Sequence, residues 1–297
     1  MRWYGVMPAI TTPFLENGDV DHEFLGRHAS WLAGHGATGI VPLGSLGEGA
    51  SLSPAEKRAV LETCVAAVGT RIPIIAGIAA ASTADAVGLA RMANDVGCSG
   101  LMVLPPYVYA SDWPEMRAHV SAVLEATPLS SMLYNNPIAY RTDFLPEQVE
   151  ELAAKHDNLH AMKESSGDVR RVSAVRARIG DRLAIFAGLD DLIVECAHVG
   201  ATGWIAGLVN ALPAESVRLF ELSQAGPSRE LDELYQWFLP LLRLDTVPKF
   251  VQLIKLVQAE VGMGSERTRP PRLALEGAER DEALRVIRAA LSTRPIR

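Results

Sequence analysis

Residues 72–104 have the sequence IPIIAGIAAASTADAVGLARMANDVGCSGLMVL. Two short apolar runs, 72–76 and 100–104, enclose a segment whose apolar residues recur with helical spacing, and Ser82 in front of that segment is a favoured helix N-cap. A strand, a helix and a second strand in this order predict a β–α–β unit in which the two strands pair in parallel.

The same alternation of apolar runs and helical segments covers most of the chain. Helix starts are indicated by the capping box Ser53-Pro54-Ala55-Glu56, by possible N-caps at Asp112 and Asp168, and by Pro146-Glu147. The predicted strands lie at 6–10, 39–43, 72–76, 100–104, 130–134, 159–163, 184–187 and 203–206. Eight units spaced by roughly 20 to 35 residues predict closure into a (β/α)8 TIM barrel, an α/β fold.

An open, doubly wound sheet is the alternative fold. It requires a glycine-rich phosphate loop after the first strand, and the sequence there is Thr11-Thr12-Pro13-Phe14. From about Pro213 the strand-like runs stop, and helices are predicted at 214–224, 228–242, 248–261 and 279–291. We therefore expect a barrel over residues 1–225 that carries the active site, followed by a C-terminal helical extension over 226–297.

Composition narrows the class of protein. Hydrophobic residues make up 48% of the chain, charged residues 21%, and the net charge is −7. These values are typical of a soluble globular protein, and they argue against a nucleic acid or a membrane as partner. Cys64, Cys98 and Cys196 show no C-x-x-C spacing, and the histidines form no ligand-like pair. We expect a cytoplasmic protein without disulfides, metal or cofactor.

Lys163 is the first candidate for chemistry. Active sites of TIM barrels lie at the carboxyl ends of the strands, and Lys163 ends the apolar run 159–163. A lysine in an apolar pocket loses its proton readily and becomes a nucleophile for carbonyl carbons, which an arginine does not. The alternative is a lysine that only pairs with a neighbour such as Glu164.

Other strand ends carry groups that suit a small acid as substrate. Tyr134 ends the neighbouring run, where a phenol can carry protons or simply pack. The turn Gly44-Ser45-Leu46-Gly47 offers successive backbone N–H groups to a carboxylate. At the ends of the other strands we expect further pocket residues, namely Thr11, Gly188, Ile205 and Gly207.

Several of these motifs together resemble the dihydrodipicolinate synthase and N-acetylneuraminate lyase family, nearly from end to end. They are Thr11-Thr12-Pro13-Phe14, Gly44-Ser45-Leu46-Gly47-Glu48, Tyr134-Asn135-Asn136-Pro137, Lys163-Glu164-Ser165-Ser166-Gly167-Asp168 and Gly200-Ala201-Thr202-Gly203.

The resemblance implies a class I, Schiff-base-forming lyase without a cofactor. In that family pattern Lys163 forms an imine with a 2-oxo acid such as pyruvate, and Tyr134 shuttles protons. Ser45 continues the relay, Tyr107 completes it from a neighbouring subunit, and the backbone amides of Ser45 and Leu46 hold the substrate carboxylate. The resemblance also implies a homotetramer, built as a dimer of dimers.

Two positions depart from the family pattern. Leu46 stands where a second hydroxyl residue is common, and Ala139 stands where dihydrodipicolinate synthases carry an arginine for the second substrate's carboxylate. Arg141 is the nearest substitute for that arginine in the sequence. A buried carboxylate without its cation costs several kcal/mol, as an order of magnitude. The departures therefore disfavour the lysine-biosynthetic reaction.

The sequence thus predicts a catabolic aldolase, dehydratase or deaminase for a 2-oxo acid or a cyclic imino acid. The pathways we expect are sugar-acid or hydroxyproline breakdown, for example by a pyrroline-4-hydroxy-2-carboxylate deaminase. One alternative is dihydrodipicolinate synthase or N-acetylneuraminate lyase proper. Another, of a different class, is a non-catalytic barrel that binds a sugar acid.

Overall fold

Short apolar runs form one parallel sheet in the computed structural model, which describes residues 1–295. The strands are β1 (Gly5–Pro8), β2 (Ile75–Ile78), β3 (Gly100–Val103), β4 (Ser130–Asn135), β5 (Leu159–Glu164), β6 (Ala184–Ala187) and β7 (Gly203–Ala206). Their order in the sheet is β1-β7-β6-β5-β4-β3-β2, and all pairs are parallel. The strands are almost wholly buried because helices cover the outer face and side chains fill the inside.

The ring closes through the segment 39–43, which was expected as a full strand. It lies between β1 and β2 but forms only two isolated parallel bridges, Ala9 with Val41 and Ile40 with Ile74. Pro42 has no N–H for a continuous ladder, and Leu43 turns away with a φ of 67°. The carbonyl of Pro42 still accepts a hydrogen bond from Gly77 N–H at 2.9 Å. The fold is therefore a TIM barrel in which one strand is reduced to bridges.

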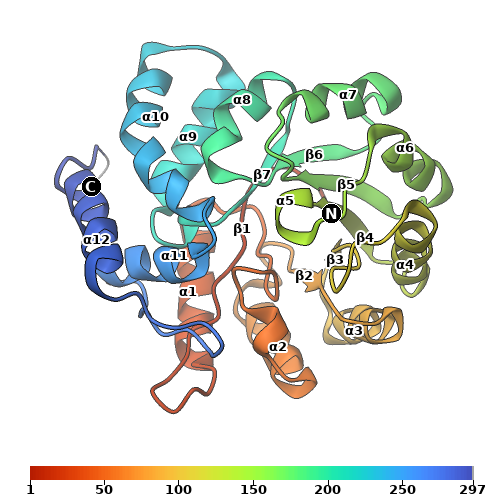
Figure 1. Cartoon of the computed structure of the whole chain (residues 1–297), viewed down its shortest axis with the longest axis horizontal. Helices are drawn as coiled ribbons and strands as arrows, with labels where there is room; N and C mark the ends of the chain where they lie inside the picture. Colours follow the sequence, from red (N-terminus) through yellow and green to blue (C-terminus); the bar gives the residue numbers. More distant parts are fainter. Residues whose placement is uncertain (296–297) are drawn as a thin grey trace.

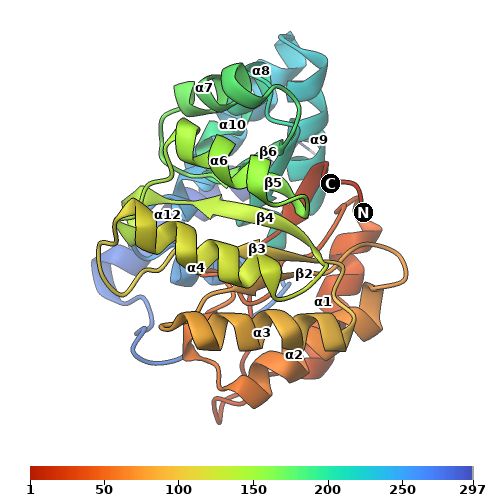
Figure 2. The ribbon, with the colours of Figure 1, turned by 90° about the vertical axis from the view of Figure 1, so that its right-hand side faces the viewer.

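Nine helices of the described chain lie in the barrel region, eight of them around the sheet (Figures 1 and 2). The eight are α1 (His22–Gly34), α2 (Pro54–Val68), α3 (Thr83–Val96), α4 (Trp113–Glu125), α6 (Pro146–Lys155), α7 (Arg170–Ile179), α8 (Ile193–His198) and α9 (Pro213–Ala225). The ninth is the short α5 (Pro137–Tyr140), which follows β4 directly. No helix in residues 1–295 has an apolar stretch long enough to cross a bilayer.

Most of the predicted helix starts are present. Ser53 forms a capping box with Glu56 at the start of α2, Ser82 caps α3, and Asp112 caps α4. Asp168 is a correction, because the N-cap of α7 is Val169. The carboxylate of Asp168 instead accepts hydrogen bonds from the side chain and the N–H of Arg170.

The C-terminal extension gathers at one side of the barrel (Figure 1). It consists of α10 (Arg229–Leu242), α11 (Phe250–Glu260) and α12 (Gly277–Ser292), with a 3-10 turn at Arg243–Asp245. Helix α10 packs on α9 and α12, while α11 contacts the 3-10 turn Leu208–Asn210 that follows β7. The extension therefore reaches the carboxyl end of the barrel, where the strands β5 to β7 finish.

Candidate active site

Lys163 and Tyr134 lie side by side at the carboxyl ends of β5 and β4. They are register partners in the sheet, and Lys163 Nζ lies 4.1 Å from the centroid of the Tyr134 ring. Lys163 is 7% exposed and Tyr134 is 5% exposed. The sheet register thus places a primary amine against a phenol, out of bulk water.

The next pair in the register, Asn135 and Glu164, fixes this placement from the other face of the sheet. Asn135 Nδ2 donates to Glu164 Oε2 at 3.0 Å, and its Oδ1 accepts from Phe144 N–H at 2.9 Å. Glu164 Oε1 accepts from Ser166 N–H. Within residues 1–295 Glu164 forms no ion pair with Lys163, so the alternative of a simple Lys163–Glu164 pair is wrong.

Burial sets the protonation of both groups. Desolvation lowers the pKa of Lys163 below its ordinary value, against the opposing charges of Asp245, Tyr140 and Asp190. Burial raises the pKa of Tyr134 to about 12, although Asn136 Nδ2 donates a hydrogen bond to its hydroxyl at 2.9 Å. The phenol therefore stays protonated near neutral pH, while the amine is more easily deprotonated than a surface lysine.

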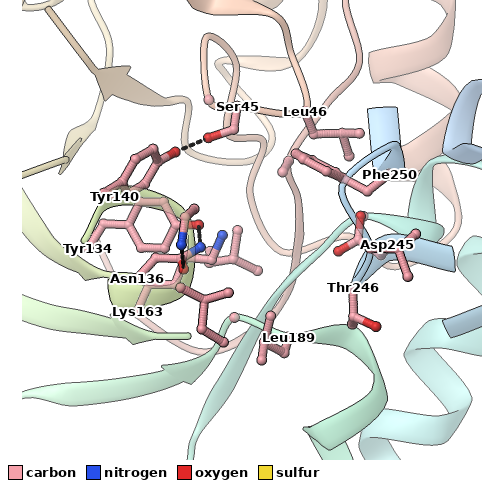
Figure 3. Close-up of a pocket in the computed structure, with 18 of the residues that line it drawn as sticks. Ser45, Leu46, Tyr134, Asn136, Tyr140, Lys163, Leu189, Asp245, Thr246 and Phe250 are labelled. Atoms are coloured by element: carbon pink, nitrogen blue, oxygen red, sulfur yellow. Dashed lines mark hydrogen bonds between the residues drawn. The ribbon is translucent and has the colours of Figure 1, made fainter. Parts of the chain in front are cut away.

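A cavity of about 470 Å³ opens above these two residues (Figure 3). Most of the site residues expected from the sequence line it, namely Lys163, Tyr134, Ser45, Leu46, Ala139, Gly188, Ile205 and Gly207. The barrel's strand ends thus meet in one chamber that is large enough for a small organic acid.

Glycines at two strand ends leave room for charged side chains. A Cβ at Gly188 would lie 2.8 Å from Lys163 Cε and 2.0 Å from Ser165 Oγ. A Cβ at Gly207 would lie 2.0 Å from Asp245 Oδ1. Both distances are far below a normal contact, so glycine at these positions makes space for the amine on one side of the cavity and for a carboxyl on the other.

Three expected site residues do not line the cavity. Thr11 is buried, and its hydroxyl donates to Gln258 Oε1 of α11 at 2.9 Å. Arg141 is exposed, because the chain turns at the end of α5 with a φ of 55°. Tyr107 is half-buried, with its ring centroid 5.9 Å from that of Tyr140. Thr11 and Arg141 therefore do not line the cavity of this chain, and substrate contact by either residue stays a prediction.

Tyr140 is a cavity residue that sequence reasoning missed. Its hydroxyl forms a short hydrogen bond with Ser45 Oγ, and its ring stands edge-on to Tyr134 with centroids 5.8 Å apart. It ends α5, which Asn136 caps by accepting from Ala139 N–H at 3.0 Å. An aromatic residue within one helical turn of Pro137, directly after a strand end, was the available signal.

The C-terminal extension also contributes to the cavity, and this contribution could not be predicted from the sequence. Its lining residues include the acid Asp245 and the cation Arg272, and the others are Thr246, Val247, Pro248 and Phe250. The active-site chamber is therefore built by the barrel and the extension together.

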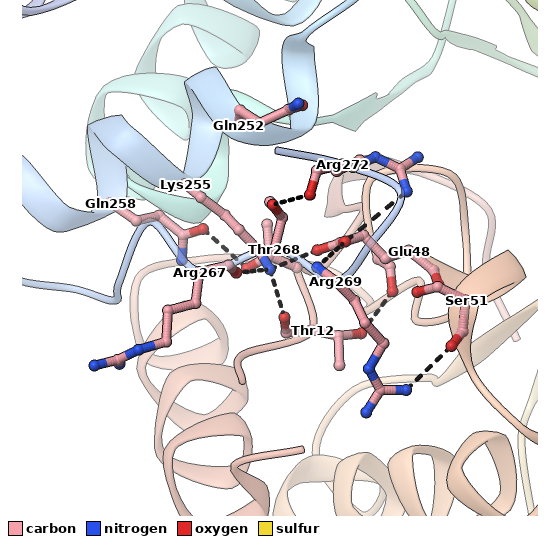
Figure 4. Close-up of polar contacts among 12 residues, drawn as sticks. Thr12, Glu48, Ser51, Gln252, Lys255, Gln258, Arg267, Thr268, Arg269 and Arg272 are labelled. Carbon is pink, nitrogen blue, oxygen red and sulfur yellow. Dashed lines mark hydrogen bonds and ion pairs between the residues drawn. The ribbon is translucent and has the colours of Figure 1, made fainter. Parts of the chain in front are cut away.

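A buried ion pair ties the extension to the turn that carries Ser45 (Figure 4). Lys255 of α11 is 2% exposed, and its Nζ donates to Glu48 Oε1 at 2.6 Å and to the carbonyl of Thr12 at 2.8 Å. Glu48 Oε2 accepts from Arg269 N–H at 3.0 Å. Thr12 Oγ1 in turn donates to the carbonyl of Gly47 at 2.6 Å. These contacts hold Gly47 and Glu48, and with them the turn of Ser45, in place.

Lys255→Met should lower the free energy of unfolding by about 3 kcal/mol, because it removes the buried cation of Glu48 and leaves only the more distant Arg272, 3.8 Å from Oε2. Lys249→Met is the matched control, since Lys249 pairs with Glu279 at the surface and such pairs contribute about 1 kcal/mol or less. Urea unfolding measures both variants. Equal losses in the two would show that the buried pair is not what holds the extension in place.

Comparison with known proteins agrees with this geometry. The model of the dihydrodipicolinate synthetase family matches residues 2–290. A 4-hydroxy-tetrahydrodipicolinate synthase of Agrobacterium fabrum is 31% identical over 267 residues, which cover 90% of this chain and 91% of the relative.

Solved structures of the same kind superpose closely. The 4-hydroxy-tetrahydrodipicolinate synthase of Methylacidiphilum fumariolicum gives a TM-score of 0.92 at 29% identity, with 98% of this chain and 95% of that chain covered. A dihydrodipicolinate synthase of Bacillus anthracis gives 0.93 at 27% identity, with 97% and 99% covered. The chain therefore belongs to the dihydrodipicolinate synthetase family and is a lyase of the class I aldolase type.

Proposed function

We propose that Lys163 forms a Schiff base with the 2-oxo group of a small organic acid. The observation that carries this proposal is the buried Lys163 amine, 4.1 Å from the ring of Tyr134, at the floor of the cavity. A neutral amine attacks the carbonyl carbon, the carbinolamine loses water, and the resulting iminium draws electrons from the neighbouring carbon. Removal of a proton from that carbon then gives an enamine.

The substrate carboxylate is held by the turn of Ser45 and Leu46 in this proposal. Within the described residues, the backbone N–H groups of Ser45 and Leu46 donate no hydrogen bond to the protein, and both residues line the cavity. Successive free N–H groups in a tight turn are suited to an anion. Leu46 makes this end of the chamber more apolar than a hydroxyl residue would.

The proton relay is proposed to run through Tyr134, Ser45 and Tyr140 of one chain. Tyr134 contacts the amine, and the hydroxyls of Ser45 and Tyr140 are hydrogen-bonded to each other. Tyr107, which the family resemblance would bring from a neighbouring subunit, packs here against the Tyr140 ring instead. A tetramer of the family type remains our proposal for the assembly, and the proposed relay draws its three members from one chain.

The proposed substrates are 4-hydroxy-2-oxo acids derived from sugar acids, or cyclic imino acids such as a hydroxylated pyrroline carboxylate. Ala139 lines the cavity where a cation was expected, Arg141 is turned away, and Arg272 of the extension is the arginine that faces the chamber. The positive charge of Arg272 thus reaches the chamber from the C-terminal extension, whereas the family pattern places an arginine in the segment after β4. This difference supports a substrate other than that of a dihydrodipicolinate synthase.

Trapping with borohydride tests the Schiff base. Pyruvate plus borohydride should add a stable mass to Lys163, and Lys163→Ala should show none, because the secondary amine forms only from an imine. Intact-protein and peptide mass spectrometry locate the adduct. Turnover that survives in Lys163→Ala, or no adduct across a panel of 2-oxo acids, would contradict the mechanism, and the latter would favour a barrel that only binds sugar acids.

Tyr140→Phe should slow imine formation about 100-fold, the size of a typical acid–base contribution. The variant keeps the ring that packs on Tyr134 but loses the hydroxyl that contacts Ser45. Stopped-flow measurement of imine formation with pyruvate gives the rate. Tyr107→Phe separates the two relays: a large loss there, with a normal Tyr140→Phe, would show that the relay passes through Tyr107.

A substrate screen separates the catabolic reaction from the second candidate, which the relatives' name favours: 4-hydroxy-tetrahydrodipicolinate synthesis. Purified enzyme should turn over 4-hydroxy-2-oxo acids or hydroxylated pyrroline carboxylates with a kcat/KM at least about 100-fold above that of the synthase reaction, a difference of about 2.7 kcal/mol. Lys163→Ala serves as the blank. The reverse order of rates would assign the chain to the synthase reaction.

A further inference from the structure

An acid of the C-terminal extension, Asp245, faces the cavity, and none of the chemistry proposed above uses it. Asp245 ends the 3-10 turn Arg243–Asp245 and lines the chamber together with Lys163 (Figure 3). Its Oδ1 is buried and has no hydrogen-bond partner within residues 1–295. Gly207 leaves the space that this oxygen occupies.

Neighbouring Asp190 shows how different the surroundings of Asp245 are. The carboxylate of Asp190 is fully buried but accepts from Trp204 Nε1 at 2.9 Å and from Leu208 N–H at 2.8 Å. It also accepts from Gly207 N–H. Asp190 is thus bound by donors on the barrel side, whereas Asp245 lines the cavity with no donor to its Oδ1 in the described residues.

The surroundings of Asp245 favour its neutral, proton-bearing form. Burial, and then the charge of Asp190, raise the pKa of Asp245 well above its ordinary value, while Lys163 opposes the shift. A buried carboxylate without donors is costly, so the group keeps its proton instead. A carboxylic acid held neutral at pH 7 is a proton donor.

We propose that Asp245 is the general acid that protonates the leaving oxygen on carbon 4 of a 3-deoxy-4-hydroxy-2-oxo acid. The proposal rests on the imine at Lys163 proposed above. It narrows the proposed substrates to those from which a hydroxyl leaves, because that departure needs an acid across the cavity from the amine, whereas pyruvate alone has no such group.

The elimination balances without an oxidant or a second reactant. The proposed relay at Tyr134 takes a proton from carbon 3, and the resulting enamine joins nitrogen, carbon 2 and carbon 3; the same proton can later return to Asp245 through solvent. Its electrons shift so that carbon 3 and carbon 4 become doubly bonded, and the bond from carbon 4 to oxygen breaks with its electron pair on oxygen. Asp245 gives its proton to that oxygen, and water leaves. Hydrolysis of the conjugated iminium then frees Lys163 and the unsaturated 2-oxo acid.

Asp245→Asn tests the role, because the amide keeps the shape but cannot donate an acidic proton. Elimination from a 3-deoxy-4-hydroxy-2-oxo acid should fall by about 100-fold or more, the size of a general acid contribution. Borohydride trapping of pyruvate on Lys163 should stay within about twofold of the wild-type rate. Asp191→Asn is the matched control, since Asp191 adjoins the same turn but does not line the cavity.

A substrate with a better leaving group makes the test specific. Chloride needs no proton to depart. The Asp245→Asn variant should therefore eliminate chloride from the 4-chloro analogue at close to the wild-type rate. Gly207→Ala is the second variant, because its Cβ must displace the carboxyl of Asp245. It should lose elimination of the hydroxy acid but still release chloride from the 4-chloro analogue, even if Asp245→Asn fails to fold.

The outcomes distinguish this inference from the Schiff-base proposal. Absence of the adduct in the wild-type enzyme overturns the Schiff base itself. Wild-type elimination in Asp245→Asn, with trapping intact, overturns only the role of Asp245. Loss of trapping together with elimination, or failure of the chloride analogue to restore the rate, also overturns it, because Asp245 would then act by positioning Lys163.

Discussion

The chemistry that we propose for this barrel depends on keeping one primary amine out of water. Lys163 sits at the end of a strand whose neighbours are buried on both faces, and the register of β4 on β5 puts the Tyr134 ring against its Nζ. Desolvation lowers the pKa of Lys163 and so favours the neutral amine that the proposed Schiff base requires. The hydrogen bonds of Asn135 and Glu164 hold that register on the opposite face of the sheet.

The sequence predicts those parts of the molecule that are local. Short apolar runs with helix signals between them give the barrel, and the ends of such runs give Lys163, Tyr134 and the turn of Ser45, since strand ends in this fold all face one way. The segment 39–43 was expected as a strand, and a proline at its fourth position reduces it to bridges.

What could not be predicted depends on contacts between distant parts of the chain. Asp245 and Arg272 reach the cavity only because the extension folds back over β7, and no spacing rule relates them to Lys163. Thr11 was predicted as a pocket residue because it follows a strand. Its hydroxyl instead donates a hydrogen bond to Gln258, which lies far along the chain. Arg141 is close to the motif in sequence, but a left-handed turn carries it to the surface.

The buried pair of Glu48 and Lys255 joins residues 207 positions apart. A ribosome delivers the turn of Ser45 early and its anchoring lysine only near the end of translation. Until then the turn lacks its contact with Lys255, and the carboxylate of Glu48 must remain hydrated. The chamber is therefore complete only after the extension, which supplies Asp245, Phe250 and Arg272 to its lining, has been synthesised and has docked. A chain cut short before α11 would be inert rather than partly active.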